Sequence, residues 1–434
     1  MRIKFNTIYH FFVVLALVAA TFASGGKEFL SAVPTAVLAC MAGFRLARSG
    51  RGLASVPRDR FGLSLGIFLA VVGMLGGLIN QDTYSSFYAI FFLLTWVSVF
   101  VVRDIYPAEQ AIRATAQAGV ISTILFLVLT RDLFMSALAM EATTGGATYR
   151  YNPFDIHPNL IGHIFGVYAI AMIWQALLGR GLIKKIVYLG VSAIALAFCL
   201  AASSRGGLFA ALIGIGAGAL PFLMRRKRTR LGIFILTPIV LAVAIPYLSS
   251  VSPFLSELLQ LDSKYRGVGS GLTGRTEGWA YVVDHMFSGD FPLVIGKGFR
   301  NEWMENLSFS IDNGYLVLMI ELGIPALLLV LYRIASLYWK ILPRFKRFTD
   351  PSVFAAFSIV VFFLAESVVA RYFIAVGNPA SILFIFLLLN PLLAPLSARE
   401  RATARHRAAT NQPHISYHPQ PGLAFTSRPG RRFK

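Results

Sequence analysis

The chain has 434 residues, of which 56% are hydrophobic and only 14% are charged, whereas soluble domains carry about 25% charged residues. This composition excludes a soluble enzyme, a disordered scaffold and a disulfide-rich secreted module, and it predicts an all-α integral membrane protein. The net charge is +20, from 40 Lys and Arg against 20 Asp and Glu. We interpret this charge as basic cytoplasmic loops that face anionic lipid, and not as a nucleic-acid-binding surface.

Apolar runs long enough to cross a membrane recur about twelve times along the chain. They lie near 8–24, 29–46, 62–80, 86–102, 112–130, 158–178, 183–202, 207–224, 231–249, 313–335, 352–369 and 380–396. The first run follows Arg2 and Lys4, and we interpret it as a retained signal anchor; a signal peptide cleaved near Ala23 is the alternative. Cys40 and Cys199 lie inside apolar runs, so no disulfide or cysteine-based metal site is expected.

The distribution of Lys and Arg predicts the orientation of these spans. With twelve spans, the strongly basic segments and both termini fall on the cytoplasmic side. These segments are the Arg2/Lys4 end, 45–60, the region around Arg103 and Arg113, Lys184–Lys185, 225–230 and 333–347. The periplasmic loops are short except at about 131–157 and at about 250–312, directly before the tenth span. Residues 1–396 thus form one membrane domain, and 397–434 are expected to be a disordered basic cytoplasmic tail.

Polar motifs are confined to about 149–330, and the first of them leads into the sixth span. Asn159 and His163 are four residues apart and would share one face of that helix. His157 and His163 are six residues apart, a spacing that does not return to one helix face, so they are not expected to bind a metal together.

A second polar motif, Ser203–Gly207, forms a tight outer turn between the seventh and eighth spans. Arg205 would be costly between two apolar spans unless it meets an anion. The glycines beside it permit a turn whose amides are open to an anionic ligand. The alternative is an interfacial Arg whose side chain extends to the outer surface.

The long loop at 250–312 carries Arg266 and then a Gly-rich segment. Gly269–Thr276 has the spacing of the nucleotide-binding GxxxxGK[ST] pattern, with Arg275 in place of Lys. Nucleotide hydrolysis is rejected, because the loop faces outward and no strand precedes it. A guanidinium still suits phosphate, and Gly296–Arg300 adds two more cations. A basic loop without a ligand is the alternative.

The fourth motif, Asp312–Leu316, begins the tenth span and is followed by Glu321. A carboxylate inside the membrane is a candidate functional group, although Glu321 could instead pair with Arg205. Glu366 in the eleventh span has the same two interpretations, with Arg371 as a nearby partner.

Together these motifs resemble those of the O-antigen ligase and O-antigen polymerase family. The resemblance rests on His157–Gly162, Ser204–Gly207, Thr273–Glu277, Asp312–Leu316 and Glu321–Gly323, all on the outer side and in the family's order. It implies an integral membrane glycosyltransferase of the GT-C type in the bacterial inner membrane. Such an enzyme acts on undecaprenyl-diphosphate-linked sugars and uses no cofactor.

The branch of the family is indicated by the start of the tenth span. Ligases typically show a His-Asn pair ten to eleven residues before a Gly-x-x-Gly. Here Asp312 stands in the His position, Asn313 and Gly323 match, and Ala326 replaces the second Gly. The resemblance therefore favours a polymerase of exopolysaccharide or O-antigen repeat units, with transfer of glycan to lipid A-core as the alternative.

The resemblance also assigns roles to the polar residues. Arg205 and Arg275 would hold the donor diphosphate without a metal, because the sequence has no Asp-x-Asp or His/Cys ligand cluster. Asp312, or else Glu277, would accept the proton of the acceptor hydroxyl. The remaining candidates are expected to contact substrate: Asn159, His163, Arg266, Arg300, Asn313, Tyr315 and Glu321.

Two other classes of function remain open from the sequence. A transporter or flippase of lipid-linked sugars would also need cations, but along a path between spans, whereas here they gather on the outer face. A structural subunit of an export complex would need no polar motifs. The expected partners are lipid-linked donor and acceptor glycans and the bilayer, with polysaccharide export and chain-length proteins as further candidates.

Overall fold

A computed structural model gives the fold over most of the membrane domain. It describes residues 5–23, 28–49, 59–103, 105–144, 151–179, 181–202, 204–224, 275–288, 292–307, 309–339, 352–375 and 377–389. Within these ranges every regular element is a helix, which confirms the predicted all-α class. The expected ninth span at 231–249, the basic run at 225–230 and the tail at 397–434 lie outside the described residues.

Eight described helices are long and apolar enough to cross a membrane. They are α2 (Val33–Ser49, extended at its start by the 3-10 turn η1, Glu28–Ala32), α3 (Arg60–Ile79), α4 (Thr83–Val102), α5 (Ala108–Leu129), α7 (Pro158–Leu178), α8 (Leu182–Ala201), α9 (Arg205–Leu223) and α13 (Gly314–Tyr338). Three shorter apolar helices, α1 (Phe5–Thr21), α14 (Ser352–Glu366) and α15 (Pro379–Leu389), fall on further expected spans. The multi-pass architecture is thus confirmed, whereas the count of twelve and the periplasmic placement of 250–312 stay predictions.

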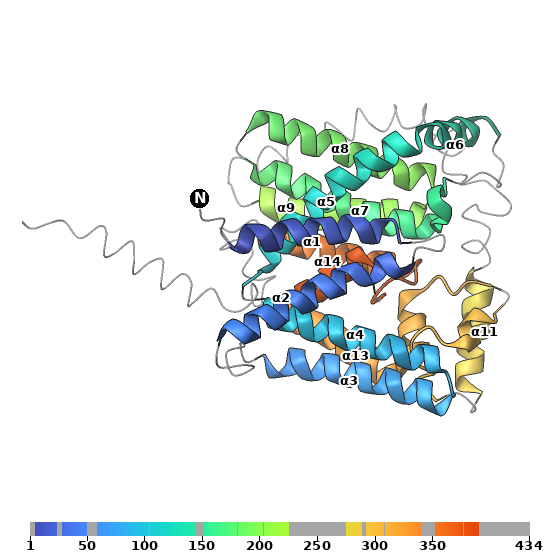
Figure 1. Cartoon of the computed structure of the whole chain (residues 1–434). Coiled ribbons are helices and arrows are strands. Elements are labelled where there is room, and N and C mark those ends of the chain that lie inside the picture. The colour runs from blue at the N-terminus through green and yellow to red at the C-terminus, as the bar shows by residue number, and fades with distance from the viewer. Residues whose placement is uncertain are drawn as a thin grey trace, which may run out of the picture. The chain divides into compact units, whose positions relative to one another are not determined.

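The segments expected as long outer loops contain helices of their own. α6 (Arg131–Thr144) and the 3-10 turn η3 (Pro153–Asp155) lie between α5 and α7, and α11 (Arg275–Phe287) and α12 (Glu302–Glu305) precede α13. Figure 1 shows α11 across one end of the bundle. It is held there by an apolar cluster in which Val282 and Met286 pack with Val317 and Ile320 of α13.

The interior of this bundle centres on α7, whose side chains from His163 to Met172 are all buried. α7 packs against α5, α8, α9 and α14 (Figure 1). Other helices present apolar side chains outward instead, such as Leu182 and Ile183 of α8, which are 73% and 78% exposed. Outward-facing Leu and Ile over whole helix faces are typical of a surface that contacts lipid.

Small residues allow the helices at the core to approach closely. A Cβ on Gly207 of α9 would lie 2.7 Å from the backbone carbon of Gly162 in α7, so only glycine fits there. Ser204 is packed against Gly162 on the same side. The first turns of α7 and α9 are therefore fixed beside each other, and these are the turns that carry Asn159 and Arg205.

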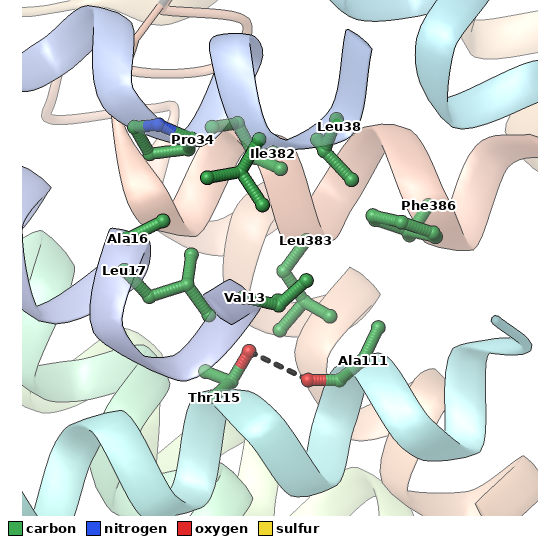
Figure 2. A pocket seen from close by; sticks show the side chains of 11 residues that line it. Val13, Ala16, Leu17, Pro34, Leu38, Ala111, Thr115, Ile382, Leu383 and Phe386 are labelled. Atoms are coloured by element: carbon green, nitrogen blue, oxygen red, sulfur yellow. Dashed lines mark hydrogen bonds between the residues drawn. The ribbon is translucent and has the colours of Figure 1, made fainter. Parts of the chain in front are cut away.

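The contact between α1, α2, α5 and α15 encloses a small apolar pocket (Figure 2). Its volume is about 20 Å³, close to the space of a single water molecule. The one hydrogen bond drawn there runs from the Thr115 hydroxyl to the carbonyl of Ala111, within α5 and at 2.9 Å. This pocket is a packing defect of the core and not a ligand site.

A buried ion cluster joins the helix ends opposite to α11. Asp59 caps α3 by accepting the Gly62 N–H at 2.9 Å, and its carboxylate also accepts hydrogen bonds from Arg103 and Arg333. The two guanidinium groups donate as well to the last carbonyls of α15, at Leu389 and Leu388. Each buried charge thus has a partner, as burial requires.

Candidate functional site

The start of α13 is shaped by Asn313, which caps the helix. Its side-chain oxygen accepts the N–H groups of Tyr315 and Leu316 at 3.0 Å each, and its amide nitrogen donates to the carbonyl of Val368 at 3.2 Å. The Tyr315 hydroxyl donates to the carbonyl of Leu364 at 2.7 Å. These two predicted substrate contacts therefore anchor α13 to the end of α14. Since Asn313 provides the cap, the neighbouring Asp312 carboxylate faces other groups.

Three of the predicted site residues are in contact, because Asn159 and Arg275 both bond to Asp312. Its Oδ2 atom accepts hydrogen bonds from the Asn159 amide and from the Arg275 guanidinium, both at 3.1 Å, and its Oδ1 atom accepts the Ser310 hydroxyl at 3.0 Å. The side chains of Arg275 and Asp312 are 22% and 13% exposed. We name Asn159, Arg275, Ser310 and Asp312 the Asp312 cluster. At its centre, the hydrogen-bonded carboxylate of Asp312 is still accessible to solvent and to a ligand.

Two members of the Asp312 cluster, Asn159 and Arg275, are held by the first turns of helices. Asn159 lies in the first turn of α7, where Pro158 suits the first helical position and the Asn159 N–H donates to the His157 ring at 3.3 Å. Arg275 is the first residue of α11, and the apolar contact of α11 with α13 brings it to Asp312. Residues more than 100 positions apart in the sequence thus converge at one point.

Arg205 lies at the same end of the molecule. It is the half-buried first residue of α9, and α9 begins beside the first turn of α7. The next residue, Gly206, packs against Val369, whose segment also carries the carbonyls bonded to Asn313 and Gly314. Arg205 therefore belongs to the same group of helix termini as the Asp312 cluster.

A break in α13 creates a second polar group. Gly323 has a φ of +81° and Pro325 has no N–H, so the carbonyls of Ile320 and Glu321 lose their helical partners. The N–H groups of Lys297 and Gly298 donate to these carbonyls instead, at 2.7 and 2.9 Å. The loop at 292–301 is thereby docked onto the broken helix.

This docking determines the partner of Glu321. The Glu321 side chain is only 8% exposed, and its Oε1 atom accepts the backbone N–H of Arg300 at 2.9 Å. Arg300 and Arg371 line the same cavity as Glu321. The partner that the structure gives Glu321 is therefore the backbone of Arg300, whereas the sequence offered Arg205.

The Arg300 and Glu321 side chains border a cavity of about 170 Å³ on the other side of the α13 terminus. We name it the Arg300 pocket. Its walls come from α4, the 292–301 loop, α13 and the segment after α14, and they include Tyr88, Gly314, Arg371 and Tyr372. Sequence patterns missed Tyr88 and Tyr372, and they indicated Arg371 only as a partner of Glu366.

His163 lies behind the wall of the Arg300 pocket, with its ring 5.4 Å from the Tyr372 ring. It is fully buried, and its Nδ1 atom is hydrogen-bonded to the carboxylate of Glu366. Direct contact of His163 with substrate, predicted from the face that it shares with Asn159, does not fit this burial. The open question about Glu366 is answered as well, because its partner is His163 and not Arg371.

The remaining predictions concern Glu277, Arg266 and the absence of a metal site. Glu277 lies in the first turn of α11 and is exposed, so the closer carboxylate to the convergence of helices is Asp312. Arg266 lies outside the described residues. In the part of the chain that the structure describes, no group of three or more His, Cys, Asp or Glu could hold a metal ion, and metal independence stays a prediction.

Comparison with known proteins finds a family match in the middle of the chain. Residues 190–331, about a third of the chain, match the family model described as O-antigen ligase. A search of curated proteins and a search of solved structures found no match. The matched region runs from α8 into α13 and contains Arg205, Arg275 and Asp312. Residues 190–331 of this multi-pass membrane protein are therefore similar to the O-antigen ligase family.

Proposed function

We propose that this protein polymerises undecaprenyl-diphosphate-linked oligosaccharide repeat units at the periplasmic face of the bacterial inner membrane. The observation that carries the proposal is the convergence of Asn159 and Arg275 on Asp312, at the group of helix termini that includes Arg205. A donor diphosphate needs cations, and an acceptor hydroxyl needs a base. Both kinds of group occur together at this point.

In the proposed reaction, the donor diphosphate binds Arg275 and Arg205. One N–H group of Arg275 donates to Asp312, and a guanidinium has five such donors in a planar fork, so Arg275 can bind phosphate while it remains beside the carboxylate. As the bond between the anomeric carbon and the diphosphate oxygen breaks, the two arginines stabilise the charge that develops on the leaving group.

Asp312 is the proposed general base. The acceptor hydroxyl loses its proton to Asp312 as its oxygen forms the new bond to the anomeric carbon, and undecaprenyl diphosphate leaves. A diphosphate competes with Asp312 for the Arg275 guanidinium, which makes the Oδ2 atom more available to the hydroxyl. The Asn159 amide and the Ser310 hydroxyl continue to orient the carboxylate. Direct displacement of this kind inverts the anomeric configuration.

Ligation of a finished glycan to lipid A-core is the second candidate function. The matching family model is described as O-antigen ligase, which supports the same donor and the same leaving group. The polymerase is preferred because Asp312 occupies the position at which the ligase branch carries a histidine.

Reconstitution tests the proposed function. Purified protein in liposomes receives an undecaprenyl-diphosphate-linked repeat unit, with or without lipid A-core. A ladder of longer lipid-linked glycans in the absence of lipid A-core supports the polymerase. Products that require lipid A-core support the ligase. Movement of unaltered substrate between leaflets would instead identify a flippase and refute the proposed function.

A further inference from the structure

The Arg300 pocket is large enough for a chemical group of a substrate. Its volume of about 170 Å³ is many times the roughly 10–15 Å³ that a cavity needs to hold one water molecule. Its lining includes Tyr88 of α4 and Tyr372, which follows α14. The pocket therefore has flat apolar surfaces and hydroxyl groups, a combination that suits a sugar ring.

The charges of the pocket leave an excess of positive charge. Arg300 and Arg371 are both exposed, whereas Glu321 is buried and is the one carboxylate among the lining residues. Two cations against one anion favour a ligand with a negative charge. Guanidinium groups bind carboxylate and phosphate in particular, because the planar fork matches their oxygens.

Arg300 is held in place before any ligand binds. Its NH1 group donates to the Tyr88 hydroxyl at 2.8 Å, and its guanidinium carbon lies 4.6 Å from the centre of the Tyr88 ring. Its backbone N–H is bonded to Glu321. Such preorganisation reduces the entropy that binding would otherwise lose.

The pocket also lies beside the proposed base. Gly314, which lines it, is two residues from Asp312, and the Tyr372 hydroxyl lies 3.5 Å from the ring of His157, two residues before the Asn159 that bonds to Asp312. Burial raises the pKa of Tyr372 to about 12, so its hydroxyl stays protonated at neutral pH beside His157. A glycan bound here is therefore close enough to present a hydroxyl to Asp312.

From these observations we infer that the Arg300 pocket binds the acceptor glycan and selects acceptors that carry a carboxylate or a phosphate, through Arg300 and Arg371. That the bound glycan is the acceptor of the reaction rests on the proposed function. The binding of an acidic sugar does not depend on it and is tested separately.

Binding is measured on the full chain in nanodiscs with three trisaccharide probes. They are identical except for the terminal sugar, which is glucuronic acid, glucose 6-phosphate or glucose. We expect an acidic probe to bind about tenfold or more tightly than the glucose probe, the effect of about one charge-assisted contact. The acidic probe that binds more tightly identifies carboxylate or phosphate as the recognised group.

Variants locate the preference. Arg300→Gln and Arg371→Gln should each reduce the preference for the acidic probe severalfold, and the double variant should abolish it. Arg371→Lys keeps the positive charge and should retain part of the preference for the acidic probe. Lys297→Gln is the matched control, because it removes a cation from the same loop whose ammonium lies over the Trp303 ring at 5.2 Å, and its preference should be unchanged.

Equal binding of the three probes, no binding of any probe, or a preference that survives in the double variant would each overturn the inference. The polymerisation assay is independent of this result. A protein that prefers acidic probes but never lengthens a lipid-linked glycan would retain the pocket and lose the proposed function. A protein that polymerises neutral and acidic units equally, without a binding preference, would retain the proposed function and refute the role of the pocket.

Discussion

Replacement of Asp312 by Asn separates the proposed chemistry from the structure around it. Asn keeps one oxygen, which can still accept the Asn159 and Arg275 groups that now bond to Oδ2, while its NH₂ group can donate to the Ser310 hydroxyl. The local geometry is therefore retained and the charge is lost. Because Asn313 caps α13, the change does not disturb the helix start.

Asp312→Asn should change the free energy of unfolding much less than it changes the activation barrier of the reaction. The ion pair with Arg275 is partly exposed, so its loss should lower the free energy of unfolding by at most about 1 kcal/mol. Loss of a positioned general base should lower turnover about a hundredfold or more, equivalent to at least about 2.7 kcal/mol on the barrier. Stability and turnover should therefore respond very differently.

The assay measures glycan lengthening in proteoliposomes and thermal unfolding of the same preparations. The matched control is Asp284→Asn, which removes an exposed carboxylate from α11 and should keep normal turnover. Near wild-type turnover of Asp312→Asn would refute the assignment of the base. If Glu277→Gln then proved inactive, Glu277 would take that role.

Four further outcomes are expected. Arg275→Ala and Arg205→Ala should each abolish polymer formation at normal protein levels, and Arg275→Lys should retain little activity, because Lys offers no planar fork; wild-type yield would exclude a role for that arginine. Asn313→Ala should lower the free energy of unfolding by about 1 kcal/mol, because the cap of α13 is lost, and an unchanged unfolding temperature would contradict this. Activity should survive excess EDTA, whereas its loss and rescue by Mg²⁺ or Mn²⁺ would overturn the metal-free mechanism. Reporter fusions at Gly271 and Lys434 should lie on opposite sides of the membrane, and a shared side would refute the twelve-span topology.

Much of the fold could be predicted because a membrane span needs an unbroken apolar run. Described helices fall on eleven of the twelve expected runs. By contrast, α6 and α11 were expected to be loops, since short helices with polar residues give no comparable pattern. α11 exists as a packed element only because Val282 and Met286 meet apolar residues of α13, a contact that no local pattern reveals.

The sequence predicted which residues belong to the candidate site better than it predicted the contacts that they make. Asn159, Arg275 and Asp312 were each singled out by a motif, and the structure brings them together. The partner of Glu321 could not be predicted, because it depends on a backbone N–H in a loop that docks more than 20 residues away in the sequence. His163 shows the opposite failure, since helical spacing does not tell a site-facing residue from a buried one.

The spacing that places this chain near the ligase pattern has a physical explanation in α13. Asn313 begins the helix and Gly323 breaks it ten residues later, so the outer part of α13 is about 15 Å long. The cap fixes one end beside Asp312, and the break frees the carbonyls that hold the loop with Arg300 at the other end. Only glycine tolerates φ of +81° without strain at this position, where a Cβ would also lie 2.4 Å from the carbonyl oxygen of Val294. One short helical segment therefore sets the distance between the proposed base and the loop that carries Arg300, and the Arg300 pocket lies along this segment from Gly314 to Glu321.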